Sequence, residues 1–121
     1  MCKSLASTSR QKRRSLKIKL ETSFTNNQWE KCKKYFNNKC AYCGKEKELT
    51  QDHFVPLSKH GEYTKNNIVP ACKSCNSRKH NKNFFEWYPR QEFYTKQREL
   101  KILQYLNYDP KTKIQQLAFT I

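Results

Sequence analysis

Two cysteine pairs constrain the fold of this chain more than any other feature of its sequence. Cys40-Ala-Tyr-Cys43 and Cys72-Lys-Ser-Cys75 each hold two thiols separated by two residues. This spacing lets one tight turn supply two ligands to a tetrahedral metal ion. Gly44 follows the first pair, where the backbone has to turn away without a Cβ clash. The doubled motif predicts structural zinc held by four sulfur ligands, with no coordination position open for catalysis.

The composition favours one domain that depends on such a metal. The chain has 121 residues, of which 36% are hydrophobic, so a large apolar core is not expected. The basic, polar N-terminus lacks the apolar segment of a secretory signal, and no run of about 20 apolar residues could span a membrane. We therefore expect a cytoplasmic protein, whose paired cysteines bind metal rather than form disulfides. Two disulfides remain the alternative, as does organelle import, because transit peptides are also rich in Arg and Ser.

The charge balance points to a polyanionic partner. Twenty-five Lys and Arg residues against 10 Asp and Glu give a formal net charge of +15, and such a field attracts nucleic acid. An anionic membrane is a weaker alternative, since the basic N-terminal run has few bulky apolar residues to bury. The other alternative is a basic surface that faces water and binds no polyanion. Residues 1–22 contain one acid, Glu21, and read as a flexible arm that could order on DNA. Its cations are Lys3, Arg10, Lys12, Arg13, Arg14, Lys17 and Lys19.

Local patterns divide the rest of the chain into three segments, residues 23–37, 38–83 and 84–121. Thr25 can cap a helix over residues 26–36, in which Cys32 is interpreted as a small buried apolar residue. Residues 49–55 and 68–69 read as short strands, and residues 73–81 as a helix. These assignments predict a small α+β fold with a cysteine-framed centre between flanking helices.

The segment after residue 83 is rich in aromatic and apolar side chains. An aromatic cluster is followed by a helical stripe that ends near Asp109-Pro110. We expect the aromatic residues to form core rather than to stack on bases, and the tail after Pro110 to be flexible. The cluster comprises Phe84, Phe85, Trp87 and Tyr88, and the stripe comprises Phe93, Leu100, Leu103 and Leu106.

The residues between the cysteine pairs carry a second pattern. A zinc scaffold alone needs no Asp52-His53 dipeptide and no asparagine at 67 or 76. These residues stand in order with Pro56, Asn67-Ile68-Val69, the Asn76 that follows the second pair, and Lys79. Over about residues 38–83 the pattern resembles the four-cysteine branch of the HNH endonuclease family. The resemblance implies a ββα-metal (His-Me finger) fold, a bacterial or phage-infected host, and a site that hydrolyses phosphodiester bonds.

The resemblance also implies a role for each residue of the pattern. His53 matches the general base that activates water. Asp52 and Asn76 match oxygen ligands of a catalytic divalent cation such as Mg²⁺, although a neutral amide holds Mg²⁺ more weakly than a carboxylate. Asn67 matches the residue that orients the imidazole and its loop. Asp52 and His53 are adjacent, so they can share one site only if the strand twists or bulges there.

The basic residues of the same region are candidates for contact with DNA. Lys79 lies on the same helical face as Asn76 and could hold a phosphate, and Arg78 precedes it. In the arm, Arg10, Lys12, Arg13 and Arg14 are expected to bind the phosphate backbone. His60 stands where relatives often have Gly and is taken as a loop residue. His80 could touch phosphate, but solvent exposure is the favoured interpretation.

We therefore expect a metal-dependent endonuclease that nicks or cuts duplex DNA and leaves 5′-phosphate and 3′-hydroxyl ends. The alternative is a non-catalytic, zinc-stabilised module that binds nucleic acid. An endonuclease that acts on RNA is a weaker form of the first hypothesis. Small HNH proteins occur in phage packaging, restriction and mobile introns, and no feature here selects among these roles. Residues 115–119, Gln-Gln-Leu-Ala-Phe, loosely resemble peptides that bind the bacterial sliding clamp, with a frayed tail as the alternative.

Overall fold

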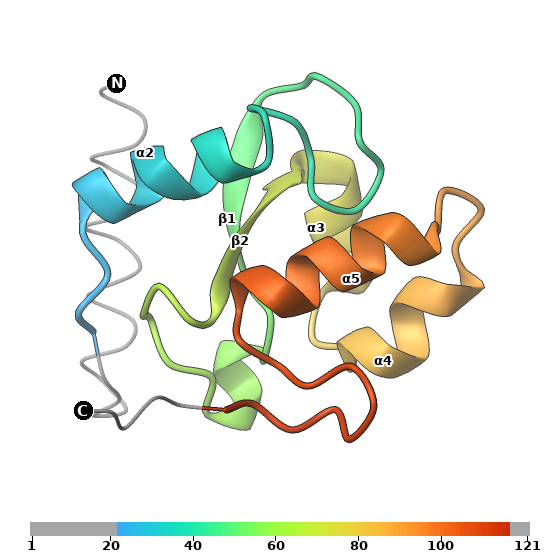
Figure 1. Ribbon diagram of the computed structural model, residues 1–121. Helices are drawn as coiled ribbons and strands as arrows, with labels where there is room; N and C mark the ends of the chain where they lie inside the picture. Colours follow the sequence, from blue (N-terminus) through green and yellow to red (C-terminus); the bar gives the residue numbers. More distant parts are fainter. Residues whose placement is uncertain (1–21, 117–121) are drawn as a thin grey trace.

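The structure, a computed structural model, describes residues 22–116. A two-stranded antiparallel ribbon lies at its centre, and helices pack around it (Figure 1). The ribbon and the helix that follows it form a ββα unit, as the sequence predicted. The elements in order are α2 (Asn26–Tyr35), β1 (Leu49–His53), the 3₁₀ turn η1 (Leu57–Lys59), β2 (Ile68–Cys72), α3 (Lys73–Lys79), α4 (Phe84–Trp87), the 3₁₀ turn η2 (Tyr88–Arg90) and α5 (Lys96–Tyr105).

The ribbon has a regular register that runs from Leu49 opposite Cys72 to His53 opposite Ile68, without a bulge. Directly opposed residues of an antiparallel pair point to the same face, and successive residues alternate. β1 is shorter than the predicted 49–55, because the backbone at Val55 bonds to the Asn67 side chain instead of continuing the ladder. β2 is longer than the predicted 68–69 and leads directly into α3.

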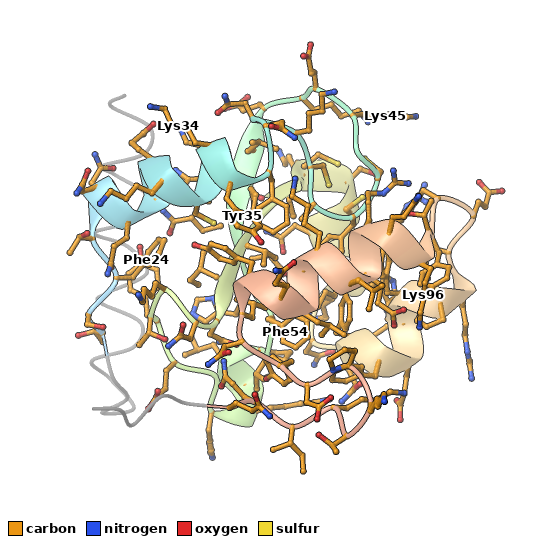
Figure 2. The ribbon with its side chains drawn as sticks, in the orientation of Figure 1. Phe24, Lys34, Tyr35, Lys45, Phe54 and Lys96 are labelled. Carbon is orange, nitrogen blue, oxygen red and sulfur yellow. The ribbon has the colours of Figure 1, made fainter. Side chains whose placement is uncertain are left out.

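The alternation along β2 separates two clusters of buried residues. Val69 and Ala71 belong to a larger cluster with residues of α4 and α5, whereas Ile68 belongs to a smaller one with Trp29 of α2. Figure 2 shows Phe54 in the interior, and Lys34, Lys45 and Lys96 at the periphery. The predicted aromatic cluster is core: Phe84, Trp87 and Tyr88 are buried.

The two longest described helices begin at threonine caps. Thr25 Oγ1 accepts from Gln28 N at 3.1 Å and Gln28 Oε1 accepts from Thr25 N at 2.9 Å, a reciprocal capping box that confirms the predicted start of α2. Cys32 is fully buried, also as predicted. The predicted apolar stripe of α5 was partly wrong. Phe93 precedes the helix, and Leu100 is 40% exposed because Ile102 takes the buried position beside Leu103.

The expectation of a flexible tail after Pro110 was wrong for residues 111–116. Tyr108 forms an antiparallel bridge with Gln115. The Gln115 amide donates to the carbonyls of Asn66 at 2.7 Å and Leu106 at 2.8 Å, which folds this segment back onto the domain. The basic arm up to residue 21 and residues 117–119 of the clamp-like segment lie outside the described residues. None of the described helices has the length and apolar character needed to cross a membrane.

Candidate active site and metal centre

The four knuckle cysteines converge on one point. The Sγ atoms of Cys40, Cys43, Cys72 and Cys75 all lie within 4.8 Å of one another. Cys43 Sγ is 3.9 Å from Cys72 Sγ, and tetrahedral zinc with bonds of about 2.3 Å spaces its sulfurs by about 3.8 Å. All four are free thiols, so the arrangement is a four-cysteine cluster rather than two disulfides. The donor set and its spacing suit zinc.

Local backbone bonds build this cluster. Gly44 N donates to Cys40 O at 2.9 Å, and Gly44 has a φ of +74°, which only a residue without a Cβ adopts readily. Ala41 N donates to Pro70 O at 2.9 Å and ties the first knuckle to β2. A hydrogen bond from Cys75 outweighs burial and lowers the pKa of Cys40 to about 5. This shift favours the thiolate, which is the form of cysteine that binds a metal.

A cavity of about 470 Å³ opens beside β1 and α3. It gathers the three residues that the sequence assigned to a catalytic base and a cation, namely His53, Asp52 and Asn76. Its walls come from β1, the turn η1 and α3, so the ββα unit itself forms the pocket. The complete lining is Thr50, Gln51, Asp52, His53, Pro56, Leu57, Ser58, Lys73, Asn76, Ser77, His80 and Asn81.

Asp52 and His53 reach this cavity although they lie on opposite faces of the ribbon. Asp52 is opposite Val69 and His53 is opposite Ile68, and these two partners belong to different core clusters. No bulge is needed, because the cavity lies at the end of β1, where both faces of the strand border it. Both residues therefore line one cavity without a bulge in the strand.

An aromatic wall supports the imidazole of His53. The ring stacks on Tyr63 with centroids 5.8 Å apart and an interplanar angle of 22°. Tyr63 is itself fixed, since its hydroxyl donates to Gln51 Oε1 at 2.8 Å and its ring packs edge-on against Phe24. His53 is 8% exposed. The imidazole is thus held between the smaller core cluster and the cavity.

Asn76 and Asp52 carry oxygen atoms of the kind that binds a hard divalent cation. Asn76 Nδ2 donates to Thr50 Oγ1 at 2.9 Å, which leaves the amide oxygen as the atom available to a cation. Burial raises the pKa of Asp52, and the neighbouring Lys79 and Tyr42 oppose that rise. A carboxylate and an amide oxygen are ligands that Mg²⁺ accepts, so the residues present fit a divalent cation.

Asn67 fixes the loop that connects β1 to β2. Its Oδ1 accepts from Val55 N at 2.8 Å, and its Nδ2 donates to Val55 O at 3.0 Å and Glu62 O at 2.9 Å. We call these three hydrogen bonds the Asn67 clamp. Gly61 lies next to them, and a Cβ there would stand 1.6 Å from Val55 O. Asn67 does not line the cavity. It holds the loop that follows His53.

Lys79 is not placed as the sequence suggested. Its side chain is fully buried, and Nζ donates to the carbonyls of His53 at 2.9 Å and Phe54 at 3.0 Å. Nζ also lies 3.5 Å from Asp52 Oδ2. Burial lowers the pKa of Lys79, and Asp52 opposes that change. The ammonium group holds the end of β1 and is turned away from a phosphate in solvent.

Among the other basic residues singled out in the sequence, Arg78 and His60 lie at the surface of the described part of the chain. Arg78 is exposed on α3. His60 is an exposed loop residue with a φ of 66°, in the left-handed region that glycine adopts most readily. Arg10, Lys12, Arg13 and Arg14 fall outside the described residues.

Sequence reasoning missed several residues that shape the site. Thr50 shares a strand face with Asp52 at a spacing of two, so it could have been found from periodicity. His80 is exposed as predicted, but it lines the cavity. Tyr42 and Tyr63 gave no such signal, since they reach the site only through tertiary packing.

Together, the antiparallel hairpin, the helix that continues from it, the Asp-His pair at the end of β1 and the four-cysteine cluster define the ββα-metal class of domain. Residues 40–82 match the family model described as HNH endonuclease, which places this part of the chain in the HNH endonuclease family. The chain is 41% identical over 97 residues to "SPbeta prophage-derived putative HNH endonuclease YoqL" of Bacillus subtilis (strain 168). This alignment covers 70% of the chain and spans 42% of the length of that relative.

Proposed function

We propose that this protein is a metal-dependent DNA endonuclease that hydrolyses phosphodiester bonds at the cavity beside β1 and α3. The observation that carries the proposal is the convergence of His53, Asp52 and Asn76 on that one cavity. A domain that only bound nucleic acid would have no need to bring an imidazole, a carboxylate and an amide oxygen to a common opening. The family match and the prophage-derived relative support the same function.

The side chains of the cavity have separate tasks in the proposed reaction. His53 accepts a proton from a water molecule, and the resulting hydroxide attacks the phosphorus atom in line with the departing 3′-oxygen. Asp52 and Asn76 would hold the cation, which when bound neutralises charge on the phosphate and on the leaving oxygen. Cleavage of the P–O3′ bond leaves a 5′-phosphate end, and the departing 3′-oxygen takes up a proton from solvent water to give a 3′-hydroxyl end. Tyr63 and Asn67 keep the imidazole and its loop in place.

The surface next to the cavity could bind the phosphate backbone of a DNA duplex. A second cavity of about 460 Å³ adjoins the first at Asn81. Its lining includes Lys59, Lys82 and Arg90 against one acid, Glu86. A phosphate backbone seated in the first cavity could continue along these cations, because phosphate contacts position a nucleic acid without reading its sequence. This adjoining surface and the net charge of +15 support DNA as the substrate.

The test compares two histidine variants on supercoiled plasmid in Mg²⁺. His53→Ala should lower the cleavage rate by roughly 10²–10⁴-fold, the usual effect of removing a general base. His60→Ala is the matched control, since His60 is a histidine outside the catalytic cavity. It should cleave at the wild-type rate. Circular dichroism and zinc content should be unchanged in both variants.

Two outcomes would reject the proposal. Cleavage by His53→Ala at the wild-type rate would remove His53 from catalysis. Failure of the wild-type protein to cut plasmid in Mg²⁺ or Mn²⁺, with DNA binding intact, would instead support a non-catalytic binding module.

A further inference from the structure

Two buried polar side chains, Tyr42 and Lys79, lie directly behind the cavity and have no part in the reaction described above. Asp52 Oδ2 accepts a hydrogen bond from the Tyr42 hydroxyl at 2.5 Å and lies 3.5 Å from Lys79 Nζ. Tyr42 and Lys79 are both fully buried, and Asp52 is 3% exposed. Both contacts of Asp52 with residues 22–116 use Oδ2, which leaves Oδ1 for a ligand in the cavity.

The buried ammonium group of Lys79 uses all of its N–H groups in contacts at the end of β1. Its donors are directed at the carbonyls of His53 and Phe54 and at Asp52 Oδ2, which matches the three N–H groups of a lysine. A buried ion pair adds little stability compared with apolar residues of the same volume. The arrangement therefore calls for an explanation other than stability, and its contacts all converge on the backbone and carboxylate that border the cavity.

Tyr42 connects the same carboxylate to the metal centre. It lies inside the first knuckle, between Cys40 and Cys43. Its carbonyl oxygen accepts from Tyr88 Oη at 2.6 Å and from Arg98 Nε at 2.9 Å. Its ring packs edge-on against Trp87, with centroids 5.2 Å apart. The position of its hydroxyl is thus set by the knuckle and the aromatic core together.

We propose that Tyr42 and Lys79 are positioning residues that hold one oxygen of Asp52 so that the other faces the cation site. Through Tyr42, the zinc knuckle sets the geometry of the catalytic carboxylate. This inference rests on the proposed function, because it takes Asp52 as a ligand of the catalytic cation. Neither residue contacts the substrate; both act through Asp52.

The experiment measures cation binding in the absence of DNA. Zinc-loaded protein is titrated with Mn²⁺, and the free ion is followed by electron paramagnetic resonance. Tyr42→Phe removes only the hydroxyl that holds Asp52 and should weaken Mn²⁺ binding about 10-fold or more, the usual effect of losing a residue that orients a metal ligand. At saturating Mn²⁺ its cleavage rate should approach that of the wild type, so the effect appears in the metal requirement.

Tyr94→Phe is the matched control. It also removes a tyrosine hydroxyl, but that hydroxyl donates to Glu99 Oε1 at 2.6 Å and contacts neither Tyr42 nor Asp52. Its Mn²⁺ affinity should equal that of the wild type. Lys79→Met keeps the apolar stem and removes the ammonium group. It should weaken Mn²⁺ binding as Tyr42→Phe does. If Tyr42→Phe loses zinc, Lys79→Met is the variant on which the inference is tested.

Three results would overturn the inference. Wild-type Mn²⁺ affinity in folded, zinc-loaded Tyr42→Phe or Lys79→Met would show that Asp52 needs no such support. Equal weakening by Tyr42→Phe and Tyr94→Phe would show a general effect of losing a tyrosine hydroxyl. A wild-type protein that neither binds Mn²⁺ nor cleaves DNA would reject the proposed function as well, whereas the first two results leave that function standing.

Discussion

Single residues in the loop after β1 determine where His53 and the cavity lie. The Asn67 side chain forms hydrogen bonds with two backbone atoms of Val55 and one of Glu62. Gly61 allows that side chain and the Val55 carbonyl to approach the backbone closely. The sequence predicted an orienting role for Asn67. The requirement for Gly61 came from the packing, since the residue in the left-handed conformation is its neighbour His60.

Gly61→Ala should destabilise the protein by about 3 kcal/mol, because the added methyl group meets backbone that cannot move without breaking the Asn67 clamp. The control is His60→Gly, one residue earlier, which relieves a left-handed conformation and should be neutral or stabilising by up to about 1 kcal/mol. Urea unfolding of zinc-loaded protein measures both. Equal stability of Gly61→Ala and wild type would show that this loop rearranges freely.

At the scale of elements, the zinc knuckles join segments that lie far apart in the sequence. The first knuckle follows α2, and the second contributes the last residue of β2 and the first turn of α3. A bound structural metal supplies folding free energy directly, and the hydrophobic content of 36% gives limited compensation. The cluster therefore holds together the β2–α3 junction that carries Asn76.

Removal of zinc should unfold the domain. A strong chelator is expected to abolish the helical circular dichroism signal, and stoichiometric zinc should restore it, because the loss of a bound structural metal removes folding free energy. The control is the same titration with a weak Mg²⁺-selective chelator, which should leave the spectrum unchanged. A fully folded protein shown to be free of metal would contradict this expectation.

At the scale of the whole molecule, charge rather than shape is expected to control affinity. The cations beside the cavity, Lys59, Lys82 and Arg90, form a short surface, and the arm of residues 1–22 adds seven more along the sequence. A compact site of this size covers few phosphates. We therefore expect the arm to supply much of the DNA affinity without sequence preference.

Deletion of the arm should flatten the dependence of DNA affinity on salt. Each neutralised phosphate contributes about −0.9 to the log–log slope, so the loss of three or four contacts should reduce the slope by roughly three. Cleavage positions and the turnover of bound substrate should persist, since phosphate contacts do not specify sequence. Affinity is measured against salt for full-length and arm-deleted protein on one duplex. Identical slopes would show that the arm does not engage DNA.

The sequence by itself determined the parts of this protein whose chemistry is local. Cysteine spacing predicted the four-cysteine cluster, Thr25 as a cap predicted the start of α2, and residue order predicted the HNH pattern. These depend on neighbours along the chain, which a sequence displays. The exposed Leu100 and the folded segment 111–116 were mispredicted, because their environments are set by distant residues.

Only the tertiary structure decided how the site is assembled. It placed Asp52 and His53 at one cavity from opposite faces of a regular strand, and it buried Lys79 behind them. It also brought the Tyr42 hydroxyl from the knuckle to Asp52. The physical reason is that side-chain direction and burial depend on which segments pack together, and residues 42, 52 and 79 meet only when the knuckle, β1 and α3 have closed on one another.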